Sequence, residues 1–106
     1  MNNIILTPSD SLVLVTSTTD TLHTTAHFAD RSDAGNLVPD NALTVVNSSG
    51  NVVICPPPDT GKRVLKTISV QNTTNGSVTV HVGILRGSAV YRLYSATIAA
   101  GATFTP

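Results

Sequence analysis

The chain has 106 residues, with six Lys plus Arg against six Asp, no Glu, and a formal net charge of zero. Thr, Val and Ile make up 35 positions (16, 13 and 6). Branching at Cβ suits the pleated surface of a sheet, so this composition excludes a helical bundle or a coiled coil. The length is that of one domain and leaves no room for a large enzyme cleft.

Charge, apolar runs and cysteine content narrow the class of protein further. The longest apolar runs, residues 12–15 and 52–55, have four residues, whereas a membrane-spanning helix needs about 20. We therefore predict no membrane segment. Cys55 is the one cysteine, so no disulfide forms within the chain, and a neutral chain has no general attraction for nucleic acid. The N-terminus lacks a secretory signal, so we expect the chain to stay where it is made or to leave inside a larger particle.

Aromatic side chains are few, and they are Phe28, Tyr91, Tyr94 and Phe104. Each large ring can bury about 150–250 Å², so the core has to be built from Val, Ile and Leu instead. Such a core is thin against a backbone entropy cost on the order of 1–2 kcal/mol per residue. We therefore expect contact with other chains to contribute to stability.

The first part of the chain predicts short strands. Residues 1–8, which include Ile4, Ile5 and Leu6, form a predicted N-terminal arm, and residues 12–15 form the next strand. Residues 22–28 alternate, with Leu22 and Phe28 at the ends of one face and His23 and His27 on the other. This pattern predicts a half-buried strand.

Turn-forming residues are frequent between residues 29 and 41, which we predict to be a loop and a candidate contact site. Residues 42–46 and 51–55 flank the polar turn 47–50 and predict a hairpin. Prolines at 56–58 cannot donate to a ladder, so they predict a rigid spacer, with a Pro-rich ligand motif as the alternative.

The second half is more regular. Residues 64–71 place Val64, Ile68 and Val70 on one face together with Lys66, and residues 77–85 alternate strictly. Residues 90–98 and 103–105 follow, so three consecutive antiparallel strands and the start of a fourth are predicted. The total is eight or nine strands. This predicts an all-β fold, an antiparallel β-sandwich of jelly-roll or immunoglobulin type, over residues 9–106.

The sequence gives little support for a catalytic site or a metal site. His23 and His27 lie about 13 Å apart on a strand and could not share a metal ion. Residues 30–36 resemble a calcium loop superficially, but the chain has no Glu to act as the bidentate ligand, so an Asx-rich turn is predicted. No local pattern sets a nucleophile beside a base. We predict no catalytic residue, no metal site, no cofactor and no enzymatic activity.

Basic residues offer a candidate contact surface. Lys62, Arg63 and Lys66 form a cluster, and Arg86 and Arg92 lie on neighbouring predicted strands. A nucleic-acid site would come with net positive charge and aromatic platforms. We therefore predict no nucleic-acid binding, and interpret these residues as solvated strand-edge charge or as salt bridges to a protein neighbour.

The order of segments resembles a family of small virion proteins of tailed bacteriophages. The resemblance covers nearly the whole chain as a pattern of residues and spacing, in residues 6–17, 22–30, 41–44, 62–72, 77–82 and 93–101. Members of such families are β-rich structural components of the particle. In the family the Ala-Gly turn leads into a longer aromatic strand, whereas here Phe104 is followed by only two residues, so a neighbouring subunit could complete this edge.

The resemblance implies assembly rather than chemistry. We expect a capsid decoration or cement protein that binds the major capsid protein lattice as a homo-oligomer, with a trimer favoured, in a virion assembled in the host cytoplasm. The alternatives are a tail, neck or fibre-attachment adaptor and, third, a carbohydrate-binding module for the host surface. The predicted partner contacts are Ile4, Ile5, Leu6, Arg86, Arg92 and Phe104.

Overall fold

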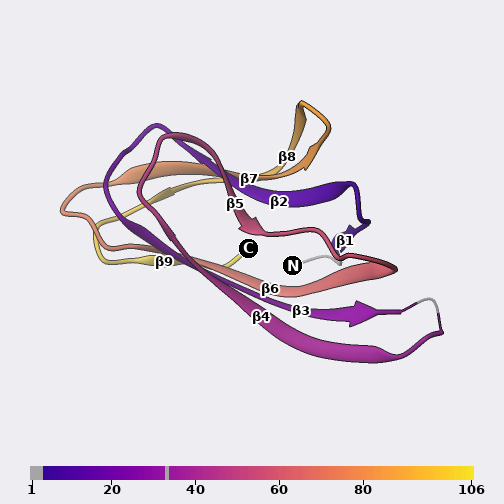
Figure 1. The fold of residues 1–106 in the computed structure, drawn as a ribbon. Helices are drawn as coiled ribbons and strands as arrows, with labels where there is room; N and C mark the ends of the chain where they lie inside the picture. Colours follow the sequence, from indigo (N-terminus) through magenta and orange to yellow (C-terminus); the bar gives the residue numbers. More distant parts are fainter. Residues whose placement is uncertain (1–3, 33) are drawn as a thin grey trace.

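The computed structural model describes residues 4–32 and 34–106, which fold into two antiparallel β-sheets packed face to face (Figure 1). The first sheet contains, in spatial order, β1 (Ile4–Leu6), β6 (Lys62–Asn72), β3 (Leu22–Arg31) and β4 (Leu37–Val46), and β9 (Thr103–Phe104) also pairs with β6. The second contains β5 (Gly50–Cys55), β2 (Asp10–Thr16), β7 (Val78–Arg86) and β8 (Ala89–Ile98). The predicted antiparallel β-sandwich is confirmed.

Most connections pass from one sheet to the other. Among the strands of the described residues, only β3–β4 and β7–β8 form hairpins within a sheet. Frequent crossing between the sheets is typical of jelly-roll sandwiches. β1 and β9 lie along the same edge of β6, where Ile4 pairs with Leu65 and Phe104 pairs with Val70. The two ends of the described chain therefore share one sheet edge.

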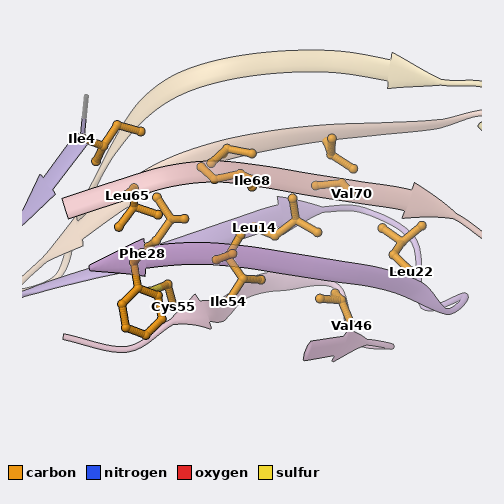
Figure 2. Packing of buried hydrophobic residues seen from close by; sticks show 14 of the residues in the cluster. Ile4, Leu14, Leu22, Phe28, Val46, Ile54, Cys55, Leu65, Ile68 and Val70 are labelled. Atoms are coloured by element: carbon orange, nitrogen blue, oxygen red, sulfur yellow. The ribbon is translucent and has the colours of Figure 1, made fainter. Parts of the chain in front are cut away.

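The core lies between the sheets and consists mainly of Leu, Ile and Val, as predicted (Figure 2). Leu14 from β2 and Ile54 from β5 meet Leu22 from β3 and Ile68 from β6. The predicted inward face of residues 22–28 is confirmed, and so is the inward face of Tyr94, Ala96 and Ile98 that alternation predicts for residues 90–98. Among the four aromatic side chains, Phe28 is the most deeply buried.

The loop predicted for residues 29–41 is wrong. β3 continues through Arg31 and β4 begins at Leu37, so the turn is confined to the residues between them. Pro39 pairs with Ala29 inside β4. Proline is tolerated there because β4 is an edge strand whose outer side needs no donor for a ladder. Asp33, which belonged to the predicted Asx-rich turn, lies outside the described residues.

Two predicted strand pairings are also wrong. Residues 42–46 and 51–55 do not form a hairpin, because β4 pairs with β3 in one sheet and β5 pairs with β2 in the other. In the same way β6 and β7 belong to different sheets, so three consecutive antiparallel strands are not formed. A short polar turn is equally able to join two strands in one sheet or to carry the chain across the end of a sandwich.

A β-bulge changes the predicted faces of β6. The register with β3 shifts so that His27 faces Thr67 and Phe28 faces Leu65. Lys66 is the extra residue, and it places Leu65 instead of Val64 on the core face with Ile68. On one side of a bulge the inward and outward residues of a strand are exchanged, which explains why the sequence pattern places Val64 on the wrong face.

The segment predicted as an N-terminal arm lies within the sheet. Ile4 and Leu6 are buried in the core, and Ile5 points outward. Residues 1–3 of the predicted arm lie outside the described residues. Contact of this segment with a neighbouring chain stays a prediction.

Candidate interaction surfaces

Arg86, a predicted partner contact, binds a carboxylate of its own chain. Its Nε and Nη2 donate to the two carboxylate oxygens of Asp10 at 2.6 and 2.9 Å, and the Asp10 side chain is buried. Thr7 donates to the same carboxylate through its N–H and its hydroxyl. These hydrogen bonds, that of Arg86 above all, hold the pKa of Asp10 far below its ordinary value. The pair ties the turn after β1 to the end of β7.

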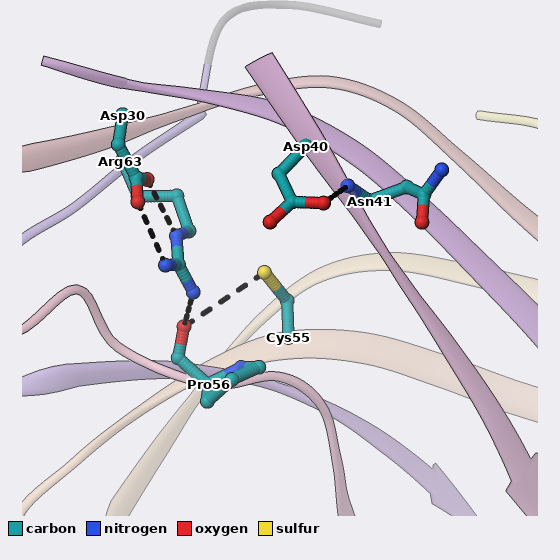
Figure 3. Close-up of polar contacts among 6 residues, drawn as sticks. All are labelled: Asp30, Asp40, Asn41, Cys55, Pro56 and Arg63. Carbon is teal, nitrogen blue, oxygen red and sulfur yellow. Dashed lines mark hydrogen bonds and ion pairs between the residues drawn. The ribbon is translucent and has the colours of Figure 1, made fainter. Parts of the chain in front are cut away.

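Arg63, from the predicted basic cluster, is also used within the chain (Figure 3). Its Nε and Nη2 bind Asp30 of β3 at 2.7 and 2.9 Å, and its Nη1 donates to the carbonyl of Pro56 at 2.6 Å. The guanidinium also stacks on the Phe28 ring, 4.0 Å from its centroid. Arg63 therefore joins β3, β6 and the proline connector. Beside it, burial raises the pKa of the Cys55 thiol, which makes Cys55 a poor nucleophile.

A cleft lies between the β3–β4 turn and the connector that follows β5. It has a volume of about 510 Å³, and its lining includes Arg31, Pro57 and Asp59 as well as the ion pair of Asp30 and Arg63. Because those two charged groups already neutralise each other, the cleft offers mainly exposed, solvated groups to a ligand. Its shape is a consequence of how the connector packs and not of converging reactive groups.

His81 and Ser95 come together on the outer face of the second sheet, which sequence reasoning missed. His81 Nδ1 and Ser95 Oγ are 2.6 Å apart. Thr79 and Thr97, the next pair on the same face further from the β7–β8 turn, are joined by a 3.1 Å hydrogen bond. In catalytic Ser–His pairs a third group commonly orients the base. In the described chain no carboxylate hydrogen-bonds to His81. The arrangement is a polar cross-strand ladder of the kind that stabilises sheets.

Part of the register between β7 and β8 can be predicted from the turn that joins them. Arg86 pairs with Ala89, so β7 and β8 are joined by a two-residue turn. Gly87 has φ +63°, as the first position of a type II′ turn requires. Recognising the turn would have aligned the two strands, but the bulge between Val82 and Gly83 shifts the register by one residue before Ser95 is reached.

The predicted partner residues do not form one surface. Ile4 and Leu6 are buried, Phe104 is half-buried against the core, and Ile5 and Arg92 are exposed. Arg92 lies beside His81 on the second sheet, away from β1 in the first sheet. The predicted set therefore divides into core residues and separate exposed positions.

Exposed apolar side chains gather on edge strands. Leu37, Val38, Leu43 and Val45 are exposed along β4. Val53 on β5 and Tyr91 and Leu93 on β8 are exposed on the edges of the other sheet. Apolar residues on an open edge are a feature of protein contact sites. The sequence predicts the strand over residues 42–46 but neither its extension back to Leu37 nor its position at the edge of a sheet.

Within residues 4–32 and 34–106, no group of three or more His, Cys, Asp or Glu side chains is arranged to hold a metal ion. The same residues contain no helix with the length and apolar character needed to cross a membrane. Comparison of the chain with family models, with curated proteins and with solved structures gives no match.

Proposed function

We propose that this chain is a structural protein of a bacteriophage virion, a capsid decoration or cement subunit that binds the major capsid protein lattice. The observation that carries the proposal is the distribution of apolar side chains. They are exposed on the edge strands β4, β5 and β8, where a neighbouring protein can bind both side chains and main chain. The resemblance of the sequence to small virion proteins supports the choice of this kind of assembly.

The proposed mechanism is multivalent burial. Each subunit contributes a modest contact, and a symmetric homo-oligomer engages several lattice positions at once, so avidity exceeds the affinity of one contact. Ile5 is half-exposed on β1, so unlike Ile4 and Leu6 it can contact the lattice while the core stays intact. Binding to the assembled shell stabilises it by mass action.

Copy number in purified particles tests the proposal directly. Quantitative mass spectrometry of virions that carry this chain should give hundreds of copies per particle for a lattice protein. A few copies, or a few tens, would assign it to a tail, neck or fibre-attachment position instead. Absence from the particles would refute both.

Replacement of Ile5 by Ser, with Asn75→Ser in the β6–β7 turn as the exposed control, locates the contact. Both side chains are exposed, so neither change should unfold the domain. Occupancy on particles should fall for the Ile5 variant only. Equal occupancy of the two variants would remove β1 from the proposed interface.

A carbohydrate-binding function is the second candidate, and it is favoured by one exposed ring. Tyr91 is exposed on β8, whereas Tyr94 packs against the core. Only Tyr91 is therefore available to stack on a sugar. Glycan-array binding by the wild type that disappears in Tyr91→Ala, but persists in Leu93→Ala, would support this function over the decoration role.

A further inference from the structure

The edges of the two sheets are protected unequally. β1 and β9 are three and two residues long, and the short edge strand β5 is offset by a bulge in its pairing with β2. β8 is longer but carries Arg92 and a bulge opposite Val82. Short strands, charges and bulges are the devices by which proteins block unwanted edge pairing. β4 instead pairs with β3 through ten residues without a register shift.

The features of β4 that block pairing with another strand are confined to its first half. Pro39 has no N–H to offer, and the N–H of Asn41 donates to Asp40 Oδ1 at 2.8 Å (Figure 3). The Asn41 N–H is therefore directed away from β3. Main-chain orientation repeats every two residues along a strand, so the main-chain groups of Leu43 and Val45 also face outward. Beyond Asn41, β4 contains neither proline nor charge.

The outward residues in the second half of β4 are apolar, and they can pack against the same residues of a second copy of the chain. Leu43 is 73% exposed and Val45 57% exposed, and both project from the outer face of the sheet. If two copies of β4 lie antiparallel about a two-fold axis at Thr44, Leu43 of each copy stands opposite Val45 of the other. Each such pair can exchange two main-chain hydrogen bonds. The four side chains then form one apolar cluster across the junction.

We propose that residues 42–46 of β4 pair with the same residues of a second copy of this chain, which joins the two first sheets into one continuous antiparallel sheet. A two-fold contact brings every group near its own symmetry mate, so a charged segment would repel itself. Residues 42–46 carry no charge, and in this register Asp40 lies opposite Ser48 of the other copy, far from the second Asp40. The proposal does not depend on a virion role.

Disulfide trapping tests the register. In the proposed pairing Thr44 faces Thr44 of the second copy at a non-hydrogen-bonded position, where Cα atoms are about 4.5 Å apart and a disulfide can form. The full chain with Cys55→Ala and Thr44→Cys should convert mostly to a covalent dimer under mild oxidation. The matched control places Val53→Cys, on exposed edge strand β5, in the same background. Equal cross-linking of the two variants, or none at position 44, would overturn the proposal.

Light scattering after gel filtration tests the association itself. At about 100 µM the wild type should have twice the 11.0 kDa mass of one chain. Leu43→Lys, which places a charge beside its symmetry mate, should raise the dimer dissociation constant at least about tenfold. Leu37→Lys is the matched control on the same strand beyond Pro39, and it should leave the dimer intact. A monomeric or trimeric wild type, or a dimer that Leu43→Lys does not weaken, would show that the pairing is absent.

Discussion

Replacement of Asn72 by Ala should be among the most destabilising single changes away from the apolar core. Asn72 is fully buried at the end of β6. Its Nδ2 donates to the carbonyls of Gly76 and Ile98 at 2.7 and 2.9 Å, and its Oδ1 accepts from the N–H and hydroxyl of Thr74 at 2.9 and 2.7 Å. The side chain thus joins the β6–β7 turn to the end of β8.

The magnitude follows from which partners can recover a hydrogen bond in the variant. The Ile98 carbonyl is buried, so losing its donor costs about 1–3 kcal/mol, whereas Gly76 and Thr74 lie at the surface and can turn to water. Together with the net contribution of the other hydrogen bonds that the variant loses, this should lower the free energy of unfolding by about 3 kcal/mol. For a domain of this size that lowers Tm by roughly 12–20 °C.

Urea titration at fixed protein concentration measures this loss, provided that the m-value stays that of the wild type. Asn75→Ala, an exposed asparagine of the same turn, is the control, and its stability should stay within about 0.5 kcal/mol of the wild type. Asn72→Asp should be worse at neutral pH than at low pH, because an ionised carboxylate would face two carbonyl oxygens. A loss below about 1 kcal/mol for Asn72→Ala would refute the reasoning.

Two further predictions concern charge and backbone conformation. The folded pKa of Asp10 is depressed, so its bond to Arg86 contributes stability that is present above the unfolded pKa of about 3.9 and is lost as pH falls below it. Asp10→Asn should lower Tm at pH 7 and flatten its decline between about pH 5 and 3, and parallel melting curves would contradict this. Gly61 has φ +67°, and a Cβ there would collide with the Arg31 carbonyl oxygen, so Gly61→Ala should cost about 2–4 kcal/mol by urea titration. Gly35 has φ +87° with open space around it, so Gly35→Ala should cost only about 1–2 kcal/mol, and equal losses would show that the collision does not matter.

The sequence predicts strands better than it predicts their partners. The alternation from Val78 to Val82 and the inward faces of β3 and β8 are local properties of the chain, and the structure confirms them. Assignment of β4 and β5 to different sheets depends on contacts between distant residues, which periodicity does not encode. The bulge at Lys66 was equally hidden, because an extra residue in a strand leaves no mark in composition.

The same limit explains the candidate surfaces. Arg63 and Arg86 were expected to be solvated or to meet another protein, yet their carboxylate partners lie 33 and 76 residues away in the same chain. Only register brings such pairs together. An arginine that looks available in the sequence is therefore a weak guide to a partner, whereas the continuous exposure of Leu43 and Val45 becomes visible only when β4 is known to be an edge.

Strand alternation divides the side chains of β1 between the core and the surface, which decides how the proposed contact of β1 with a neighbour can be tested. Ile4 and Leu6 fill the core, and truncation of a buried Ile or Leu to Ala typically costs about 2–5 kcal/mol. Removal of the first seven residues would therefore cancel much of the free energy of unfolding of a typical domain, which is about 5–15 kcal/mol. A loss of binding in such a variant would then show that the domain had unfolded, and not that a contact had been lost. Ile5 projects to the opposite side. Contact with a neighbour can therefore be tested at Ile5 alone, where the core is left intact.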